Sequence, residues 1–277
     1  MKIALIQQRV TRDKQANIAR GLANLEAAAR NGATLACYAE LAFEWFHPQH
    51  PAAGDVRSLA EPLDGPLVRA FCEKAREHGI VVVLNLFERQ DTATFDSSPV
   101  IDADGTLLGV TRMVHITEYA CFHEQGYYTP GDKGAPVFRT RAGNVGVAIC
   151  YDRHFPEYMR ALALAGADLV VVPQAGAVGE WPDGLYEAEM RVAAFQNGYY
   201  VALCNRVGRE DRLDFAGESF VCAPDGAVVA RAGRGSEEIL YAEVDLASTA
   251  TSHARQLFLR HRRPELYAQW LSDRPHF

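Results

Sequence analysis

Long hydrophobic runs and a secretion signal are missing from this chain of 277 residues, and basic residues cluster only near 255–263, where they indicate a solvated or interface segment. No apolar stretch reaches the roughly 20 residues of a membrane-spanning helix, so we expect no membrane contact. The net charge is −7 and no run of Lys and Arg stands out, which argues against a nucleic-acid partner. Residues 1–10 resemble a strand rather than a signal peptide, because Lys2 is followed by only four apolar residues. These features predict a cytoplasmic protein.

Cys-x-x-Cys spacings and linker-like segments are missing as well. The six cysteines are scattered along the chain, which in a reducing compartment predicts free thiols rather than disulfides or a zinc site. No low-complexity stretch divides the sequence, and 48% of its residues are hydrophobic. We therefore predict one domain over residues 1–277 with a substantial core.

Strand and helix patterns alternate along the chain. Short apolar segments predict strands, and apolar stripes with capping signals predict helices. The predicted strands are 2–7, 34–38, 80–87, 95–101, 106–114, 145–149, 169–172, 199–205, 218–222, 227–231 and 239–244. The predicted helices are 13–31, 65–78, 156–165 and 184–197. Asp104-Gly105 and Asp225-Gly226 predict hairpins, the first with a type I′ turn.

The two halves of the chain repeat one theme. Residues 29–40 resemble residues 163–174, since each segment contains a helix end, a Gly-Ala pair and a buried strand. Each half also has its own Asp-Gly hairpin. The pattern predicts an α/β fold in which two mixed β-sheets face each other with helices outside.

Cys150 is the most informative residue of the chain. The apolar run 145–149 places it at the end of a strand, and Pro156 and Glu157 indicate that a helix begins soon after. A thiol at such a junction feels the positive end of the helix dipole, which lowers its pKa and favours the nucleophilic thiolate. A structural cysteine ending a core strand is the alternative, because free cysteine is often buried.

A thiol nucleophile needs a base, and two glutamates are candidates. Glu40 follows a buried strand, where desolvation would raise its pKa into a useful range. Glu124, within residues 122–132, is a candidate second carboxylate. The alternatives are a surface acid at a strand end for Glu40 and an ordinary loop acid for Glu124.

Histidines offer a competing interpretation. A dyad of Cys150 with His115 or His154 is an alternative to the carboxylate pairing. His115, His123 and Glu124 could also be read as metal ligands, but their spacing fits no tight metal motif. We therefore predict no metal and no organic cofactor.

Four motifs together resemble the nitrilase, or carbon–nitrogen hydrolase, superfamily. They are Tyr-Ala-Glu-Leu (38–41), Thr-Pro-Gly-Asp (129–132), Cys-Tyr-Asp-Arg-His-Phe-Pro-Glu (150–157) and Arg-Arg-Pro-Glu-Leu-Tyr (262–267). The resemblance runs from residue 2 to about 267. It implies a four-layer αββα sandwich, assembly into homodimers or higher homo-oligomers, and a covalent thioester mechanism on non-peptide C–N bonds. In that mechanism Glu40 matches the general base, Cys150 the nucleophile and Glu124 the second glutamate.

One position departs from the family pattern. The family has a lysine in an Arg-Lys-x-His motif after the first hairpin, and Met113 stands in its place here. That lysine stabilises the oxyanion of the tetrahedral intermediate, and losing one such donor typically costs a factor of about 10²–10³ in turnover. Arg112 is a poor substitute, because neighbours on a strand point to opposite faces. The chain is then an impaired variant, a pseudoenzyme, or an enzyme in which another cation fills the role.

Arg153 bears on the substrate. Branches of the family that cleave N-carbamoyl amino acids tend to carry arginine here, where it resembles a clamp for the substrate carboxylate. An ion pair with Glu157 is the alternative. The stretches 189–197 and 204–208 look like those of β-ureidopropionase and N-carbamoyl amino acid hydrolases. The remaining candidates for contact with the substrate are Tyr119, Tyr151, His115, Gln174 and Trp181.

The leading prediction is an amidohydrolase that cleaves an N-carbamoyl amino acid or related ureido acid, a small-molecule substrate, through a thioester on Cys150. An aliphatic amidase or nitrilase is the first alternative. A non-catalytic binding or regulatory pseudoenzyme is the second.

Overall fold

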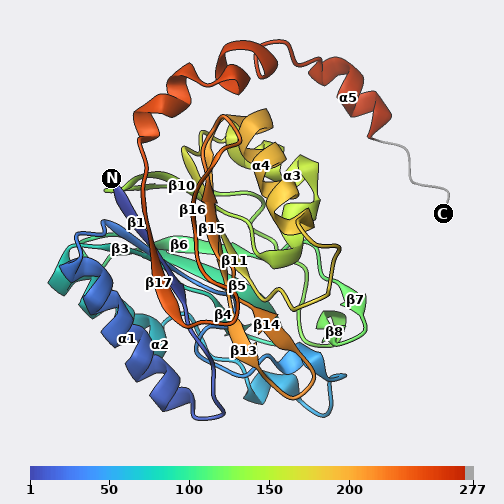
Figure 1. Cartoon of the computed structure of the whole chain (residues 1–277). Helices are drawn as coiled ribbons and strands as arrows, with labels where there is room; N and C mark the ends of the chain where they lie inside the picture. The colour runs from blue at the N-terminus through green and yellow to red at the C-terminus, as the bar shows by residue number, and fades with distance from the viewer. Residues whose placement is uncertain (272–277) are drawn as a thin grey trace.

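Two β-sheets face each other at the centre of the protein, with helices on both outer sides (Figure 1). The computed structural model describes residues 1–271, so the last residues of the predicted domain, 272–277, lie outside the described residues. The first sheet has the order β17-β1-β2-β3-β5-β4, with β6 beside β5. Its strands are β1 (Lys2–Gln7), β2 (Leu35–Tyr38), β3 (Val81–Val83), β4 (Leu86–Gln90), β5 (Ala93–Ile101), β6 (Leu107–Arg112) and β17 (Glu238–Glu243).

The second sheet repeats the arrangement of the first. Its order is β16-β15-β12-β11-β10-β9, and its central strands β10, β11 and β12 are parallel, as are β1, β2 and β3. Its strands are β9 (Val137–Thr140), β10 (Gly143–Val147), β11 (Leu169–Gln174), β12 (Tyr200–Asn205), β15 (Phe220–Cys222) and β16 (Val228–Arg231). The internal similarity of residues 29–40 and 163–174 thus reflects two matching strands, β2 and β11.

Alternation of side chains divides the core into three layers. On β1, Ile3 and Leu5 face the second sheet, whereas Ala4 and Ile6 face the helices. The helices α1 (Lys14–Arg30) and α2 (Pro66–His78) cover the outer face of the first sheet, and α3 (Pro156–Leu164) and α4 (Leu185–Asn197) cover that of the second. The predicted αββα sandwich is therefore confirmed.

The helices begin and end where the sequence indicates. The Asp13 side chain caps α1 by accepting the Ala16 N–H, and proline opens both α2 and α3. After β17 the chain leaves the sandwich as an arm of short helical turns that ends in α5 (Pro264–Trp270) and arcs away from the body (Figure 1). No helix within residues 1–271 combines the length and apolar character needed to span a membrane.

Two local predictions need correction. The predicted strand 80–87 is divided into β3 and β4, which pair with β5 in one continuous register but are separated at Leu84 and Asn85. The predicted type I′ turn at Asp104-Gly105 is wrong, because a type I′ turn needs two residues with positive φ. In this loop only Gly105 has a positive φ (+84°), and its N–H donates to the Asp102 carbonyl at 2.9 Å. This is a three-residue loop with glycine in the left-handed region. The sequence patterns also missed β9 and two small hairpins, β7 (Glu118–Tyr119) with β8 (Phe122–His123) and β13 (Val207–Arg209) with β14 (Asp214–Ala216).

Candidate active site

Cys150 lies in a strained turn between β10 and α3. Its backbone φ is +41°, a left-handed conformation that non-glycine residues rarely adopt, and its side chain is buried. A 3₁₀ turn, Cys150–His154, follows it, and α3 begins only at Pro156. The Arg153 guanidinium folds back on the turn and donates from Nη1 to the Cys150 carbonyl at 3.0 Å. Such a turn presents the thiol away from the sheet, as a nucleophile elbow does.

The predicted lowering of the thiol pKa is wrong. Burial raises the pKa of the Cys150 thiol well above its usual range, and the charges of Glu40 and Glu124 raise it further, with partial opposition from Arg153. The dipole of α3 cannot compensate, because α3 starts six residues later and the effect is confined to the first turn. The thiol therefore needs a base to become a nucleophile.

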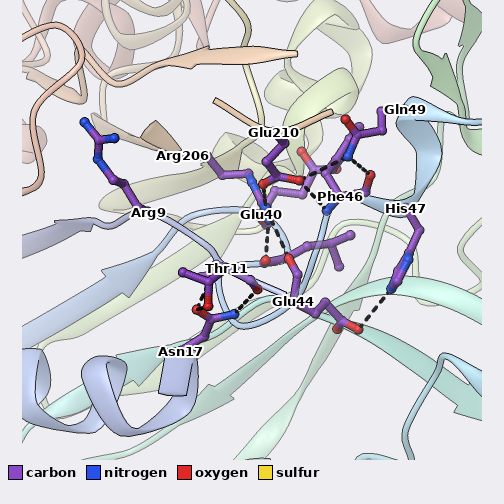
Figure 2. A network of polar contacts seen from close by, with 12 residues as sticks. Arg9, Thr11, Asn17, Glu40, Glu44, Phe46, His47, Gln49, Arg206 and Glu210 are labelled. Atoms are coloured by element: carbon purple, nitrogen blue, oxygen red, sulfur yellow. Dashed lines mark hydrogen bonds and ion pairs between the residues drawn. The ribbon is translucent and has the colours of Figure 1, made fainter. Parts of the chain in front are cut away.

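A buried arginine fixes the turn that carries Glu40. Arg206 donates to the carbonyls of Glu40 at 2.9 Å, of Glu44 at 3.1 Å and of Leu41, and it pairs with Glu210 (Figure 2). Figure 2 shows this guanidinium between Glu210 and the loop that follows β2. Leu41 has a φ of +44°, so this turn is also strained. The network holds the backbone on which the Glu40 side chain depends.

The Glu40 carboxyl is fully buried, and no N–H group among residues 1–271 donates to either of its oxygens, although the Cys150 thiol and the Asp96 carboxyl lie beside it. Burial and the charge of Glu124 raise its pKa to about 8, while the Cys150 thiol and the Asp96 side chain partly oppose that rise. A carboxyl whose pKa lies near the working pH is suited to accept and return a proton. The alternative interpretation of Glu40, a surface acid at a strand end, is excluded.

Two more buried acids lie close to Glu40. Glu124 is fully buried and accepts the Thr117 N–H at 3.3 Å, and burial followed by the charge of Asp96 raises its pKa well above the usual range. Asp96, on β5, is equally buried, and burial followed by the charge of Glu40 raises its pKa in the same way. Asn85 links the turn that follows Glu40 to β5, since it accepts the Leu41 N–H at 2.7 Å and donates to Asp96 at 2.5 Å.

Met113 lies in the apolar layer between the sheets, and its side chain is 1% exposed. Its backbone N–H donates to the Asp96 carbonyl at 2.9 Å, so the position of the family lysine adjoins the acid cluster. All four lysines of the chain pair with acids elsewhere. These pairs are Lys2 with Glu243, Lys14 with Glu44 and Glu61, Lys74 with Glu77, and Lys133 with Asp132.

The histidines are engaged with carboxylates rather than arranged as a dyad. His115 Nδ1 lies 2.7 Å from Asp152 Oδ1, and the ring stacks on Phe155 with centroids 3.5 Å apart. His154 Nδ1 lies 2.6 Å from Glu189. Within residues 1–271, no group of three or more His, Cys, Asp and Glu side chains is arranged to hold a metal ion.

Arg153 and Gln174 form one unit beneath the cysteine. Arg153 Nη1 donates to Gln174 Oε1 at 3.0 Å, and its Nε lies 3.4 Å from Glu189. The ion pair considered as the alternative role of Arg153 is present, but its partner is Glu189 rather than Glu157, and the arginine also supports the turn of Cys150. Its Nη2 is buried without an acceptor.

Tyr119 lies near the cysteine, and Trp181 lies beside Tyr119. The Tyr119 hydroxyl donates to Glu180 at 2.5 Å, the Tyr119 and Trp181 rings lie 6.0 Å apart, and Trp181 also contacts His154. Burial and then Glu180 raise the pKa of Tyr119, and the Cys150 charge raises it further, so the phenol is near the thiol. Tyr151 instead packs against His154 and Phe155.

Sequence reasoning missed several residues of this site. A signal did exist for Asp96, because a charged residue within the apolar strand 93–101 has to face something polar. Glu180 and Arg206 gave no comparable signal, since their partners, Tyr119 and the Glu40 loop, are distant in sequence. Together these residues build a buried, acid-rich environment around a thiol, which suits nucleophilic attack with proton transfer by a carboxyl.

Comparison with known proteins gives consistent matches over the whole fold. The family model for carbon-nitrogen hydrolase matches residues 2–254. N-carbamoylputrescine amidase of Solanum lycopersicum is 34% identical over 281 residues, covering 96% of this chain and 93% of that protein. Citrullinase of Francisella tularensis is 32% identical over 278 residues, covering 96% of each. Beta-ureidopropionase of Arabidopsis thaliana is 32% identical, covering 77% of this chain and 57% of that protein.

Solved structures agree with these matches. The carbon-nitrogen hydrolase of Helicobacter pylori G27 superposes with a TM-score of 0.88 at 28% identity, covering 98% of each chain. An amidase from Nesterenkonia sp. AN1 superposes with a TM-score of 0.81 at 27% identity, covering 98% of this chain and 96% of that one.

Proposed function

This chain belongs to the carbon–nitrogen hydrolase family and acts on non-peptide C–N bonds, and we propose that its substrate is a ureido compound cleaved through a thioester on Cys150. The observation that carries the proposal is the meeting of a buried thiol with a buried, unpartnered Glu40 carboxyl. Three relatives are named N-carbamoylputrescine amidase, citrullinase and beta-ureidopropionase, and the substrates in these names share a terminal carbamoyl group.

The Nesterenkonia amidase supports the role of the cysteine. Its solved structures include one with covalent addition of the acetamide moiety of fluoroacetamide at the active site cysteine. By analogy, Cys150 is the residue of this chain that would become acylated. The strained φ of Cys150 and the Arg153 hydrogen bond to its carbonyl suit a nucleophile held in one orientation.

In the proposed reaction, ionised Glu40 accepts the thiol proton as Cys150 Sγ attacks the carbamoyl carbon. The oxyanion forms beside the backbone N–H of Tyr151, which directly follows the nucleophile. Glu40 then gives its proton to the departing nitrogen, the C–N bond breaks, and an acyl-enzyme remains. Water attacks that thioester with Glu40 again accepting a proton, and the C–S bond breaks to restore the thiol. Glu124 is the second carboxyl that keeps Glu40 at a raised pKa.

Arg153 divides its head group between support of the cysteine turn and an unused donor. Its Nη1 and Nε are directed to the Cys150 turn and Glu189, whereas Nη2 is buried without an acceptor and suits a substrate carboxylate. A carboxylate on the substrate therefore stays part of the proposal, and aliphatic amides and nitriles are the alternative substrates.

We further propose that the chain acts as a homodimer or a higher homo-oligomer. The C-terminal arm exposes apolar side chains, of which Trp270 is 62% and Leu271 66% exposed. Such a surface is typical of an interface. Light scattering at micromolar concentration should give at least twice the monomer mass of 30.5 kDa, and a monomer would contradict this.

A substrate panel tests the proposed function. The protein is incubated with N-carbamoylputrescine, citrulline and N-carbamoyl-β-alanine, and separately with aliphatic amides and nitriles, while ammonia release and intact mass are measured. Turnover of a carbamoyl compound, lost in Cys150→Ala, is expected. Turnover of amides or nitriles alone would contradict the ureido assignment. The absence of both turnover and adduct, even in Met113→Lys, would contradict catalysis and favour a binding role.

A further inference from the structure

The acid cluster beside Cys150 has an unusual number of carboxyl oxygens to which no group in the described part of the chain donates. Both oxygens of Glu40, Oδ2 of Asp96 and Oε1 of Glu124 are buried and accept no hydrogen bond, although the three side chains are fully buried. The Tyr128 hydroxyl is also buried without a partner. Buried polar groups are normally satisfied, so four such oxygens at one place indicate a ligand that donates hydrogen bonds.

These groups form one cluster. Asn85 connects the backbone after Glu40 to Asp96 through two hydrogen bonds, and Asp96 accepts from Asn85 on the oxygen opposite to its free one. The charge of Glu40 acts on Asp96, that of Asp96 acts on Glu124, and both Glu40 and Glu124 act on the Cys150 thiol. Glu40 and Glu124 therefore lie near the sulfur, and Asp96 lies beside both of them.

No cation among residues 1–271 donates to these oxygens. The four lysines pair with other acids, as described above. The Arg206 head group bonds to backbone carbonyls and Glu210, and that of Arg153 to the Cys150 carbonyl, Gln174 and Glu189. Met113, which adjoins Asp96, has no donor in its side chain.

The charge balance of the cluster favours a positive ligand. Uncompensated carboxylates are costly to bury, so the acids stay protonated until a cation arrives. A developing oxyanion would meet the same carboxylates unfavourably, whereas a planar cation with several N–H groups would satisfy them. We propose that this site also hydrolyses guanidinium or amidinium groups, the cationic isosteres of ureido and amide groups. The inference rests on the Cys150–Glu40 pair of the proposed function.

The chemistry balances without an oxyanion. Ionised Glu40 accepts the Cys150 proton, the C–S bond forms, and the C=N electron pair moves to nitrogen, so the tetrahedral intermediate is uncharged. Glu40 returns the proton to one nitrogen, the C–N bond breaks, and ammonia leaves an S-alkyl isothiouronium on Cys150. Water adds to that carbon and gives up its protons through Glu40 as the C–S bond breaks. A guanidinium thus yields a ureido product and ammonium.

Binding tests the charge preference without turnover. Cys150→Ala is titrated by calorimetry with N-butylguanidine and with N-butylurea, which differ only in the group that replaces the carbonyl oxygen. We expect the guanidinium to bind at least about 10-fold more tightly, because its hydrogen bonds to carboxylates are charge-assisted. Titration in buffers of different ionisation enthalpy should show proton release for the guanidinium only. Equal or weaker guanidinium binding would overturn the inference.

Turnover separates this inference from the proposed function. The native protein should release ammonia from N-butylguanidine, form a Cys150 adduct and lose both in Cys150→Ala. Met113→Lys should lower guanidine turnover and raise urea turnover, each by about 10²-fold, whereas the uncharged control Met113→Leu should leave the preference unchanged. Asp96→Asn should weaken guanidine turnover by about 10-fold or more. Thermal melts confirm that each variant is folded.

The outcomes are distinct. Turnover of N-butylurea without turnover of N-butylguanidine overturns this inference and leaves the proposed function in place. If neither N-butylurea, N-butylguanidine nor any compound of the carbamoyl panel is turned over or forms an adduct, both this inference and the proposed function are overturned.

Discussion

Two strained turns, one in each half of the chain, carry the acid and the thiol, and they are held in different ways. Leu41, next to Glu40, has a φ of +44°, and Cys150 has a φ of +41°. Each turn is bound through its carbonyls by a buried arginine. Arg153 lies three residues after Cys150, whereas Arg206 reaches the Glu40 turn from the other half of the chain.

This difference separates local from global support. The Cys150 turn is shaped mainly by its own 3₁₀ turn and by Arg153. The Glu40 turn needs Arg206, Glu210 and Asn85, so it is complete only when both sheets have docked. Damage to the Arg206 network should therefore mainly lower stability, whereas damage to the Arg153 contact should mainly lower the reaction rate.

Removal of the thiol should have the largest effect on rate. Cys150→Ala should reduce turnover by about 10⁴-fold or more, because no covalent intermediate can form. The free energy of unfolding should change little, since alanine fits where a small buried side chain stood. Steady-state ammonia release and urea denaturation measure the two quantities. Substantial residual turnover would show that the sulfur does not react.

Replacement of Arg206 should have the largest effect on stability. Arg206→Leu leaves Glu210 buried without its partner, and we expect a loss of about 3–5 kcal/mol in the free energy of unfolding. The matched double variant Arg206→Leu/Glu210→Leu removes the stranded charge and should recover part of that loss. If the single and double variants are equally stable, the pair does not support the turn as described.

The protonation of Glu40 predicts a pH-dependent stability. Its pKa in the folded protein is about 8, above its ordinary value of 4.5, so the folded state keeps a proton that the unfolded state loses. This group therefore destabilises the fold progressively as pH rises from about 4.5 to 8. Relative to native protein, Glu40→Gln should gain stability across that window and no further above it. A pH-independent difference would contradict the raised pKa.

Replacement of the local arginine should have the smallest effect. Arg153→Lys keeps the charge but loses the second hydrogen bond of the guanidinium, at a cost of about 1 kcal/mol. Because the Cys150 turn loosens, turnover should fall about 10-fold, with substrate binding less affected. A larger loss of stability here than in Arg206→Leu would reverse the comparison of the two turns.

Most of the scaffold could be predicted from the sequence because it follows local periodicity. The strands 2–7 and 200–205 and the helix 66–78 match apolar patterns and capping residues directly. The division at Asn85 could not be predicted, because that residue leaves the strand to bond with Leu41 and Asp96. Its role depends on contacts between distant segments.

The site was predictable only in its reacting groups. Glu40 and Cys150 stand at strand ends, where a polar residue after an apolar run is conspicuous. Asp96 and Arg206 acquire their roles when the sheets meet, and the thiol pKa was mispredicted for the same reason. The helix dipole is a local feature, whereas the burial and the carboxylates that dominate come from other elements.

Alkylation of Cys150 by iodoacetamide as a function of pH tests most directly whether Glu40 serves the thiol. Peptide mapping distinguishes this cysteine from the other five. In the native protein the rate should rise with an apparent pKa near 8 as Glu40 ionises, and Glu40→Gln should be slower at pH 8 because the base is gone. An equal or faster rate in Glu40→Gln would contradict the account, since it would mean that the carboxylate only repels the thiolate.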